Sequence, residues 1–226
     1  MIVVIQCAGS KRADAGRLSA PDGRPVRFVA HPELAPDDGE FYARPDDACG
    51  GGSTWRDLLL AINQSGTASP PNLLAAATLY RPAVYQGLLE HVGRQKLYIL
   101  SAGWGLVRSD FQLPDYDITF SGQAERYKRR RKADLYEDFH MLPQGSDEPI
   151  LFFGSKDYLP LFRQLSADHR GQRIVLFRLA EPPDCPECTV VKYDTPRRTN
   201  WHYEAAERYM AGNLQLPVRE DAERLA

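Results

Sequence analysis

Residues 2–11 read IVVIQCAGSK, an apolar run rich in β-branched side chains that ends in a turn of small residues. Such a run is typical of a strand that is buried on both faces of a parallel sheet. The same pattern recurs in LYILS (97–101), ILFF (150–153) and RIVLF (173–177). We therefore predict that these segments are strands of one sheet.

Apolar residues recur at helical spacing between and after these strands. The predicted helices span residues 55–63, 73–91, 124–139, 156–165 and 202–210. Because strands that alternate with helices are typical of α/β proteins, we predict a single three-layer α/β domain over residues 1–212, with a central, mainly parallel sheet. Residues 213–226 are expected to form a C-terminal tail.

A long segment rich in glycine, proline and aspartate, residues 14–54, follows the first strand. Within it, only residues 26–30 resemble a strand. Loops of this length in compact domains are usually functional lids or partly disordered segments. We therefore predict either that residues 14–54 cover a site at the strand ends or that they form a decorated surface loop.

Composition and charge narrow the classes of function. The chain of 226 residues carries 28 basic and 30 acidic side chains, for a net charge of −2. Such a protein lacks the broad basic surface of a general nucleic-acid binder, so any polyanion site must be local. No apolar run approaches the roughly 20 residues of a membrane span, and the first residues lack the order of a secretory signal. We expect a cytoplasmic protein with no membrane contact and no obligate protein partner.

The cysteines are too few and too scattered for a disulfide framework, which favours a reducing compartment. Cys185 and Cys188 have the CxxC spacing of half a zinc site, but no second pair follows to complete four ligands. The alternative is a turn before a strand. We predict neither metal nor cofactor, and the absence of a Walker loop, a GxGxxG turn and a GxSxG elbow disfavours P-loop NTPases, dinucleotide-dependent enzymes and acyl hydrolases.

The turn after the first strand is the first candidate for a binding site, because ligands of open parallel sheets bind beyond the carboxyl ends of the strands. Cys7 and the small residues after it let the backbone approach a ligand, and Ser10 and Lys11 can donate to a phosphate or a base. A bare turn of small residues is the alternative.

The second candidate follows the strand at 97–101, which leads through Ser101, Gly103 and Trp104 into LPDYDIT (113–119). The indole offers a flat face for stacking, and carboxylates follow within reach of the same strand end. Stacking beside carboxylates suits a nucleobase or a sugar. Alternatively, LPDYDIT is an edge strand whose Asp115 and Asp117 point to one solvated face, and the pair then has no functional meaning.

Two cationic segments are candidates for phosphate binding. The first consists of Lys128, Arg129, Arg130, Arg131 and Lys132. Consecutive cations on a helix cover all of its sides, so some of them contact phosphate or turn inward, or else the helix is solvated and salt-bridged. The second segment, residues 195–204, combines Arg197 and Arg198 with Asn200 and His202, and here the alternative is that Thr199 or Asn200 merely caps the next helix.

Four motifs together resemble a bacterial family of uncharacterised domains: CAGSK (7–11), TLYRPAVYQ (78–86), ILSAGWGLV (99–107) and PDYDITFS (114–121). That family carries Cys-Ser-Lys, then Leu-Ser-Ala-Lys-Tyr-Gly-Leu, then Pro-Tyr-Asp, in the same order and at similar spacing over the first half of this chain. Gly103 and Trp104 stand where the family has Lys-Tyr, so the role of that lysine does not carry over.

The family is similar to base-exchange and archaeosine-type modification proteins and, in its α/β layout, to the uracil-DNA glycosylase superfamily. FFGSKDYLPLF (152–162) and RRTNWHYEAA (197–206) further resemble a branch of anti-phage DNA glycosylases that remove bulky modified bases. The resemblance implies a uracil-DNA glycosylase-like fold. It also implies a hydrolase that flips a modified base, such as one with a glucosylated hydroxymethyl group, out of phage DNA and cleaves its N-glycosidic bond, leaving an abasic site.

Candidate roles in this reaction follow from its charge changes. Departure of the base leaves positive character on the sugar, which Asp117, or else Asp115, is expected to stabilise. His202, helped by Asn200, is expected to stabilise the departing base. The remaining predicted roles are stacking by Trp104 or Tyr116, pocket lining by Cys7, Ser10, Lys11, Ser101 and Gly103, and phosphate binding by Lys128 to Lys132, Arg197 and Arg198.

Two other functions remain open. The first is a non-catalytic DNA-binding protein of stress protection, whose DNA binding would survive loss of Asp117 and His202. The second is a soluble nucleoside or nucleotide N-glycosidase, which would tolerate neutralisation of Lys128 to Lys132.

Overall fold

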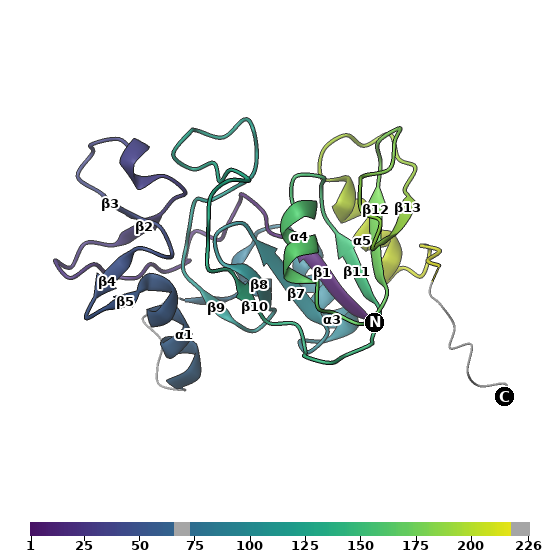
Figure 1. Ribbon diagram of the computed structural model, residues 1–226, viewed down its shortest axis with the longest axis horizontal. Coiled ribbons are helices and arrows are strands. Elements are labelled where there is room, and N and C mark those ends of the chain that lie inside the picture. Colours follow the sequence, from purple (N-terminus) through teal and green to yellow (C-terminus); the bar gives the residue numbers. More distant parts are fainter. Residues whose placement is uncertain (66–72, 218–226) are drawn as a thin grey trace.

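One central sheet of seven strands contains the four predicted strands side by side (Figure 1). The computed structural model describes residues 1–65 and 73–217. Across the sheet, the strands are β10 (Phe139–His140), β8 (Gly105–Arg108), β7 (Leu97–Ser101), β1 (Ile2–Gln6), β11 (Ile150–Phe153), β12 (Arg173–Phe177) and β13 (Thr189–Lys192). The prediction of strands at β1, β7, β11 and β12 is confirmed.

Most neighbouring strands of this sheet run parallel. β1 pairs parallel with both β7 and β11, and β12 pairs parallel with β11 and β13. β8 returns antiparallel to β7, and β10 pairs parallel with β8. All residues of β7 and β11 are buried, as expected for strands that are covered on both faces.

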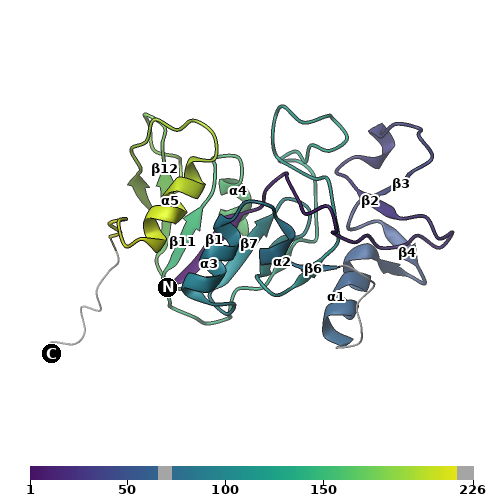
Figure 2. The same cartoon turned by 180° about the vertical axis from the view of Figure 1, so that it is seen from behind.

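Helices cover both faces of the sheet and give the fold three layers. α3 (Val84–Val92) and α5 (Trp201–Met210) contact each other on one face, where α2 (Ala76–Leu79) also lies (Figure 2). α4 (Leu159–Leu165) lies on the opposite face. The α/β class and the mainly parallel sheet are therefore confirmed. Because the chain leaves β1 and β11 on opposite faces, a topological switch point lies between these two strands, where open sheets form ligand sites.

The long excursion after β1 forms a small lobe beside the β8–β10 edge of the sheet (Figure 1). Its elements are β2 (Val26–Phe28), η1 (Pro32–Leu34), β3 (Phe41–Ala43), β4 (Ala48–Gly50) and β5 (Ser53–Thr54), followed by α1 (Trp55–Ser65). A further antiparallel pair joins β6 (Leu74–Ala75) to β9 (Gln112–Leu113). The Phe28 ring lies edge-on to Trp104, at 5.1 Å between centroids, so aromatic packing joins the lobe to the sheet. Buried residues of both parts belong to one hydrophobic core cluster.

The helix predicted over residues 73–91 is interrupted. α2 ends at Leu79 and α3 begins at Val84, because Tyr80 has extended backbone and Pro82 both lacks an N–H donor and restricts the residue before it. The helices predicted at 55–63 and 202–210 are confirmed as α1 and α5. The helix predicted at 156–165 begins only at Leu159.

The prediction of a helix over residues 124–139 is wrong, because this segment contains only turns and extended backbone. Its backbone bonds elsewhere: the Thr119 N–H donates to the Lys128 carbonyl (3.0 Å), and the Arg130 N–H donates to the Thr119 carbonyl (2.9 Å). The Arg130 side chain turns inward to Asp138. These tertiary bonds override a helical periodicity that by itself is only a weak preference.

The predicted tail, residues 213–226, is described as far as Pro217, whose carbonyl accepts a hydrogen bond from the Gln172 side chain (2.7 Å). Residues 218–226 lie outside the described residues. Within residues 1–65 and 73–217, no helix combines the length and the apolar character that crossing a bilayer requires.

Candidate active site

A polar cleft of about 780 Å³ opens beyond the carboxyl end of β1, between the sheet and the small lobe. The turn after β1 supplies Gly9 and Lys11, and the excursion supplies Arg17, Arg27 and Tyr42. Asp115, Tyr116 and Asp117 form another side, and Tyr127 closes it from the loop that follows. Cations, carboxylates and tyrosines thus converge on one concave surface, as in a binding site for a polar ligand.

Lys11 is fixed at the edge of this cleft by its backbone. Lys11 forms an antiparallel bridge with Tyr80, and the next N–H, that of Arg12, donates to the Leu79 carbonyl (2.9 Å). The Lys11 Nζ lies 4.1 Å from the centroid of the Tyr116 ring. Burial lowers the pKa of the Lys11 amine, although the charges of Cys7, Asp115 and Asp117 act to raise it.

The two predicted carboxylates lie on one side of an extended segment. The Asp115 N–H donates to the Gly16 carbonyl (2.7 Å), and the Asp117 N–H donates to the Phe28 carbonyl (2.7 Å). Both residues line the cleft, and so does Tyr116 between them, although Tyr116 is only 3% exposed. The alternation that predicted an edge strand is therefore present, but its polar side faces the cleft.

Each carboxylate has a cationic partner. Asp115 pairs with Arg17 (Oδ2 to Nη2, 3.2 Å), and Asp117 pairs with Lys128 (Oδ2 to Nζ, 2.8 Å). The Asp117 side chain is 58% exposed and that of Asp115 is 31% exposed. Asp117 is thus the more exposed of the two carboxylates in the cleft.

A hydrogen-bonded group of hydroxyls supports the floor of the cleft. The Ser101 hydroxyl donates to the Tyr116 hydroxyl (2.9 Å), which also shares a hydrogen bond with the Tyr80 hydroxyl (2.7 Å). The Ser101 Oγ also accepts the N–H groups of Gly103 and Trp104. Burial raises the pKa of Tyr80 and Tyr116 well above the ordinary value, so both are neutral hydroxyls at pH 7. Ser101 therefore positions Tyr116 rather than lining the cleft.

The ends of β1 and β11 are tied together at the switch point. The Cys7 thiol shares a hydrogen bond with the Tyr158 hydroxyl (3.2 Å), and the Ser155 N–H donates to the Gln6 side-chain oxygen (2.6 Å). Cys7 is 5% exposed, so it lies under the site rather than on its surface. Ser10, by contrast, is exposed, and its carbonyl accepts the N–H of Arg81 (3.1 Å).

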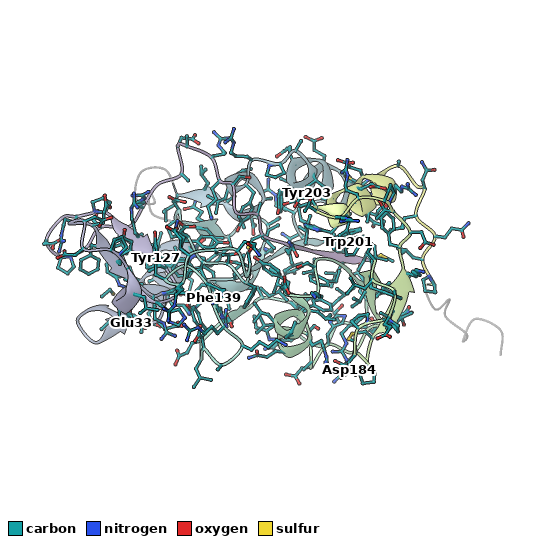
Figure 3. The ribbon with its side chains drawn as sticks, turned by 90° about the horizontal axis from the view of Figure 1, so that it is seen from above. Glu33, Tyr127, Phe139, Asp184, Trp201 and Tyr203 are labelled. Atoms are coloured by element: carbon teal, nitrogen blue, oxygen red, sulfur yellow. A yellow bond between two sulfur atoms is a disulfide. The ribbon has the colours of Figure 1, made fainter. Side chains whose placement is uncertain are left out.

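His202 does not share the cleft with Asp117, so the paired roles predicted for them are wrong. His202 is 3% exposed on α5, beside the rings of Trp201 and Tyr203. Figure 3 shows these two neighbours well apart from Tyr127 of the cleft. The physical reason is the helical period: positions 201, 202, 205 and 206 form the buried side of α5. Burial lowers the pKa of His202 to about 4, and both ring nitrogens lack a partner among the described residues.

Asn200, predicted to help His202, is exposed at the start of α5. It adopts left-handed backbone with φ of 52°, and its side chain makes no capping hydrogen bond. Neither the proposed help to His202 nor the side-chain cap that formed the alternative is observed.

Trp104 is wrong as a stacking residue. Its side chain is 0% exposed and packs against Phe28 and Phe139 in the core. The carbonyls of Gly103 and Trp104 accept hydrogen bonds from the buried Arg56 guanidinium (3.1 Å each), which fix the position of this turn. Tyr116 is the predicted stacking residue that reaches the cleft.

The first cationic segment is only partly available for phosphate. Arg130 is wrong as a phosphate contact, because its guanidinium is buried against Asp138 and the Ala102 carbonyl. Lys128 is engaged by Asp117 and Glu125. Arg131 and Lys132 are exposed. Arg129 is half-buried and bonds the Gly122 carbonyl.

The second cationic segment divides in the same way. Arg197 lies near Glu204 (3.7 Å between Nε and Oε2), whereas Arg198 forms no ion pair with any described residue. Arg198 lines a second pocket of about 180 Å³ at the ends of β11 and β12, together with Lys156, Arg178 and Trp201.

Cys185 and Cys188 form the predicted turn before β13. The Cys188 N–H donates to the Cys185 carbonyl (2.9 Å), and the two thiols are joined as a disulfide. Glu187 lies between them and pairs with Arg163. The interpretation as a turn is confirmed.

Several residues of the cleft were not predicted. Arg17, Arg27 and Tyr42 lie in the excursion, whose irregular composition gives no signal for individual side chains. Tyr80 does not line the cleft but supports Tyr116 beneath it, and it lies within the quoted motif TLYRPAVYQ, so a signal for that residue was present. No protein-family model matches this chain, and no curated protein matches it. The chemistry of the cleft is therefore inferred from its own residues.

Proposed function

We propose that the chain is a DNA glycosylase with a uracil-DNA glycosylase-like fold, which cleaves the N-glycosidic bond of a bulky modified base in phage DNA and leaves an abasic site. The reaction takes place in the cleft beyond β1. The observation that carries this proposal is the pair of carboxylates, Asp115 and Asp117, which face the same cleft as Lys11 and the Tyr116 ring.

The carboxylates suit the positive charge that develops on the sugar. As the base departs, a carboxylate beside the sugar stabilises the cationic transition state and orients a water molecule. Asp117 takes this role because its side chain is 58% exposed in the cleft. Asp115, held by Arg17, adds negative charge to the same side.

The departing base gathers negative charge, and the cleft offers donors that replace the buried His202. Arg17 and Arg27 both line the cleft and reach it from the excursion. A guanidinium stays protonated at all ordinary pH values and donates in a fixed planar geometry, so it stabilises a developing anion without first having to take up a proton.

The size of the cleft supports a base with a bulky substituent. Ligand pockets commonly enclose about 300–1,000 Å³, and this cleft of about 780 Å³ is at the upper end of that range. Its polar lining of arginines, aspartates and tyrosines suits the hydroxyls of an attached sugar. The base would reach it only after extrusion from the duplex.

The exposed cations define a confined phosphate footprint. Arg131 and Lys132 on the loop after the cleft, and Arg198 beside the second pocket, are exposed and form no ion pair with the described residues. Phosphate contacts of this kind position the duplex without reading its sequence. A footprint of a few cations is consistent with the net charge of −2.

The direct test is incubation with duplex DNA that contains glucosylated hydroxymethylcytosine, followed by detection of alkali-labile abasic sites. We expect base release by the wild-type protein and a loss of about 100-fold or more in rate for Asp117→Asn. Asp194→Asn is the matched control and should leave the rate unchanged, because Asp194 is 87% exposed and follows β13, at the opposite edge of the sheet from β10.

Two outcomes of this test contradict the proposal. The first is that no base is released from any modified DNA. The second is that Asp117→Asn and the wild-type protein release base at the same rate. DNA binding that survives in both proteins without base release would instead identify the non-catalytic binding protein.

A soluble nucleotide N-glycosidase is the second candidate, favoured by the engagement of Lys128 and Arg130 with carboxylates. With these two cations paired inside the protein, fewer remain for a polymer backbone. The same assay with free modified nucleotides distinguishes the two functions, since only the soluble enzyme would prefer the monomer.

A further inference from the structure

We infer that Lys11 is an amine nucleophile, which attacks the abasic sugar left by base release and gives the protein a strand-cleaving lyase activity. This inference rests on the proposed function for its substrate. It is carried by the position of Lys11, by its lack of an ionic partner and by the carboxylates that face it.

Lys11 is the only lysine among the residues that line the cleft in the described structure. Its backbone is bridged to Tyr80, and its Nζ rests on the Tyr116 ring at 4.1 Å from the centroid. The Tyr116 ring is in turn held by hydrogen bonds with Ser101 and Tyr80. The amine is thus placed by a rigid support, as nucleophilic catalysis requires.

The carboxylates near Lys11 are engaged by other cations. Asp115 pairs with Arg17 and Asp117 pairs with Lys128, and Lys11 forms no ion pair within 4 Å among the described residues. The neighbouring Tyr80 and Tyr116 hydroxyls are neutral. A half-buried amine without a close carboxylate loses its proton more readily than one in water, and desolvation lowers the pKa of Lys11 here.

The environment of Lys128, which pairs with Asp117, is the opposite of that of Lys11. Burial acts to lower the pKa of Lys128, but hydrogen bonds to Asp117 and Glu125 hold this pKa well above the ordinary value. Lys128 therefore remains an ammonium that neutralises Asp117, while Lys11 is free to act as a base or nucleophile. The two lysines thus have separate roles, although only Lys11 lines the cleft in the described structure.

The covalent step follows the chemistry of a primary amine with an aldehyde. In the ring-opened abasic sugar, the Lys11 lone pair forms a bond to C1′, and the carbonyl electron pair moves to oxygen. Proton transfer from nitrogen to that oxygen gives a carbinolamine. Uptake of one further proton from solvent lets the oxygen leave as water and leaves a protonated imine. Asp117 or Asp115 then takes a proton from C2′, and the electron pair of that bond expels the 3′ phosphate by elimination. Hydrolysis of the protonated imine with one water releases the unsaturated aldehyde, returns the proton to solvent and restores the neutral Lys11 amine.

Three other amines of the chain offer a comparison. The amino group of Met1 is bound by Glu148 at the opposite, amino-terminal end of β1, and Lys96 binds the same carboxylate. Lys192 is exposed on β13 and pairs with Asp194. None of these three amines lines the cleft in the described part of the chain.

The test uses the full-length protein and duplex DNA with one preformed abasic site, so that it does not depend on base release. Sodium borohydride reduces a protonated imine to a stable covalent complex, which is separated on a denaturing gel and mapped by mass spectrometry. We expect the wild-type protein and Lys192→Gln to be trapped equally, with the modification on Lys11, and Lys11→Gln to lose trapping and strand cleavage by at least about 100-fold.

The inference is overturned if the wild-type protein yields no trapped complex, or if the modification maps to another residue. Full trapping of a folded Lys11→Gln protein has the same consequence. Should Lys11→Gln fail to fold, the mapped position in the wild-type protein decides alone. Release of a modified base without trapping would reject the role of Lys11 but retain the proposed function. Trapping on abasic DNA without any base release would retain the role of Lys11 but reject the proposed function.

Discussion

The guanidinium of Arg130 and the carboxylate of Asp138 form a buried ion pair, with 2.6 Å between Nη2 and Oδ2 and side chains only 5% and 1% exposed. Arg130 also donates to the Ala102 carbonyl (2.9 Å) and lies over the Tyr136 ring. The pair anchors the loop after Phe120 to the turn that follows β7. Of the five consecutive cations at 128–132, Arg130 therefore stabilises the fold and is not available to a phosphate.

Replacement of Arg130 should destabilise the fold. Arg130→Met leaves the Asp138 carboxylate buried without its partner, which costs about 3–5 kcal/mol of the free energy of unfolding. Urea denaturation followed by circular dichroism measures this cost. The neighbouring Arg131 is exposed, so Arg131→Gln should change stability by no more than about 0.5 kcal/mol. Equal stability of both variants would show that the Arg130–Asp138 pair contributes nothing.

The exposed cations of the same loop should affect DNA affinity instead. The double variant Arg131→Gln/Lys132→Gln should reduce the slope of log affinity against log salt by about 1.8, because each lost phosphate contact removes about 0.9. Fluorescence anisotropy with labelled duplex DNA at several salt concentrations measures the slope. Lys192→Gln, on the edge strand β13, should keep the wild-type slope. An unchanged slope in the double variant would place the phosphate footprint elsewhere.

Stability should fall between pH 6.5 and pH 4 because of His202. Its pKa is lowered from 6.5 to about 4 in the folded protein, so the unfolded chain binds a proton in this range and the folded protein does not. The stabilisation is complete above pH 6.5 and is lost as the pH falls towards 4, by about 3 kcal/mol in all.

Unfolding by urea at several pH values checks this dependence. His202→Phe should flatten it between pH 4 and pH 6.5, since the group that titrates is gone. His140→Gln, at an exposed position, should retain the wild-type dependence. If the stability of His202→Phe falls with pH as steeply as that of the wild-type protein, other groups cause the effect.

Gly105 should not tolerate a side chain. It has φ of +86°, and a Cβ atom there would lie 2.5 Å from the Phe139 carbonyl oxygen, at the pairing of β8 with β10. Gly105→Ala should therefore lose more than about 3 kcal/mol of stability, from backbone strain and the clash together. Thermal unfolding measures the loss. Gly122→Ala, where nothing lies within 4 Å of the added atom, is the matched control and should change stability by about 1 kcal/mol at most.

The central strands could be predicted because their signal is local. Residues 2–6 and 150–153 are nearly continuous apolar runs rich in β-branched or aromatic side chains, and a strand covered on both faces buries such a run completely. The small residues after β1 and the alternation around Tyr116 likewise pointed to segments that line the cleft. The prediction of a helix at 124–139 was wrong, because helical periodicity carries no information about the hydrogen bond of Arg130 to a carboxylate eight residues later.

The roles of residues within the site depend on the direction in which each side chain points, and local sequence patterns do not show that direction. Trp104 follows a strand end and offers a flat ring, but the turn of β7 into β8 directs it at Phe28 of the excursion and into the core. His202 stands among polar and aromatic residues, yet its position on α5 faces the sheet. In both cases the burial of a large apolar surface outweighed the availability of the side chain to a ligand.

The sequence by itself determined the strands, the α/β class and the strand end at which polar residues gather, because each depends on hydrophobic pattern over a few residues. Only the tertiary structure decided which of those residues share a cleft. It brought Lys11 over Tyr116 and beside Asp115 and Asp117, roughly a hundred residues later in the chain, and gave each carboxylate a different cation. The physical reason is that the charge state of a lysine depends on burial and on the distance to its partners, and both are set by packing between segments far apart in sequence.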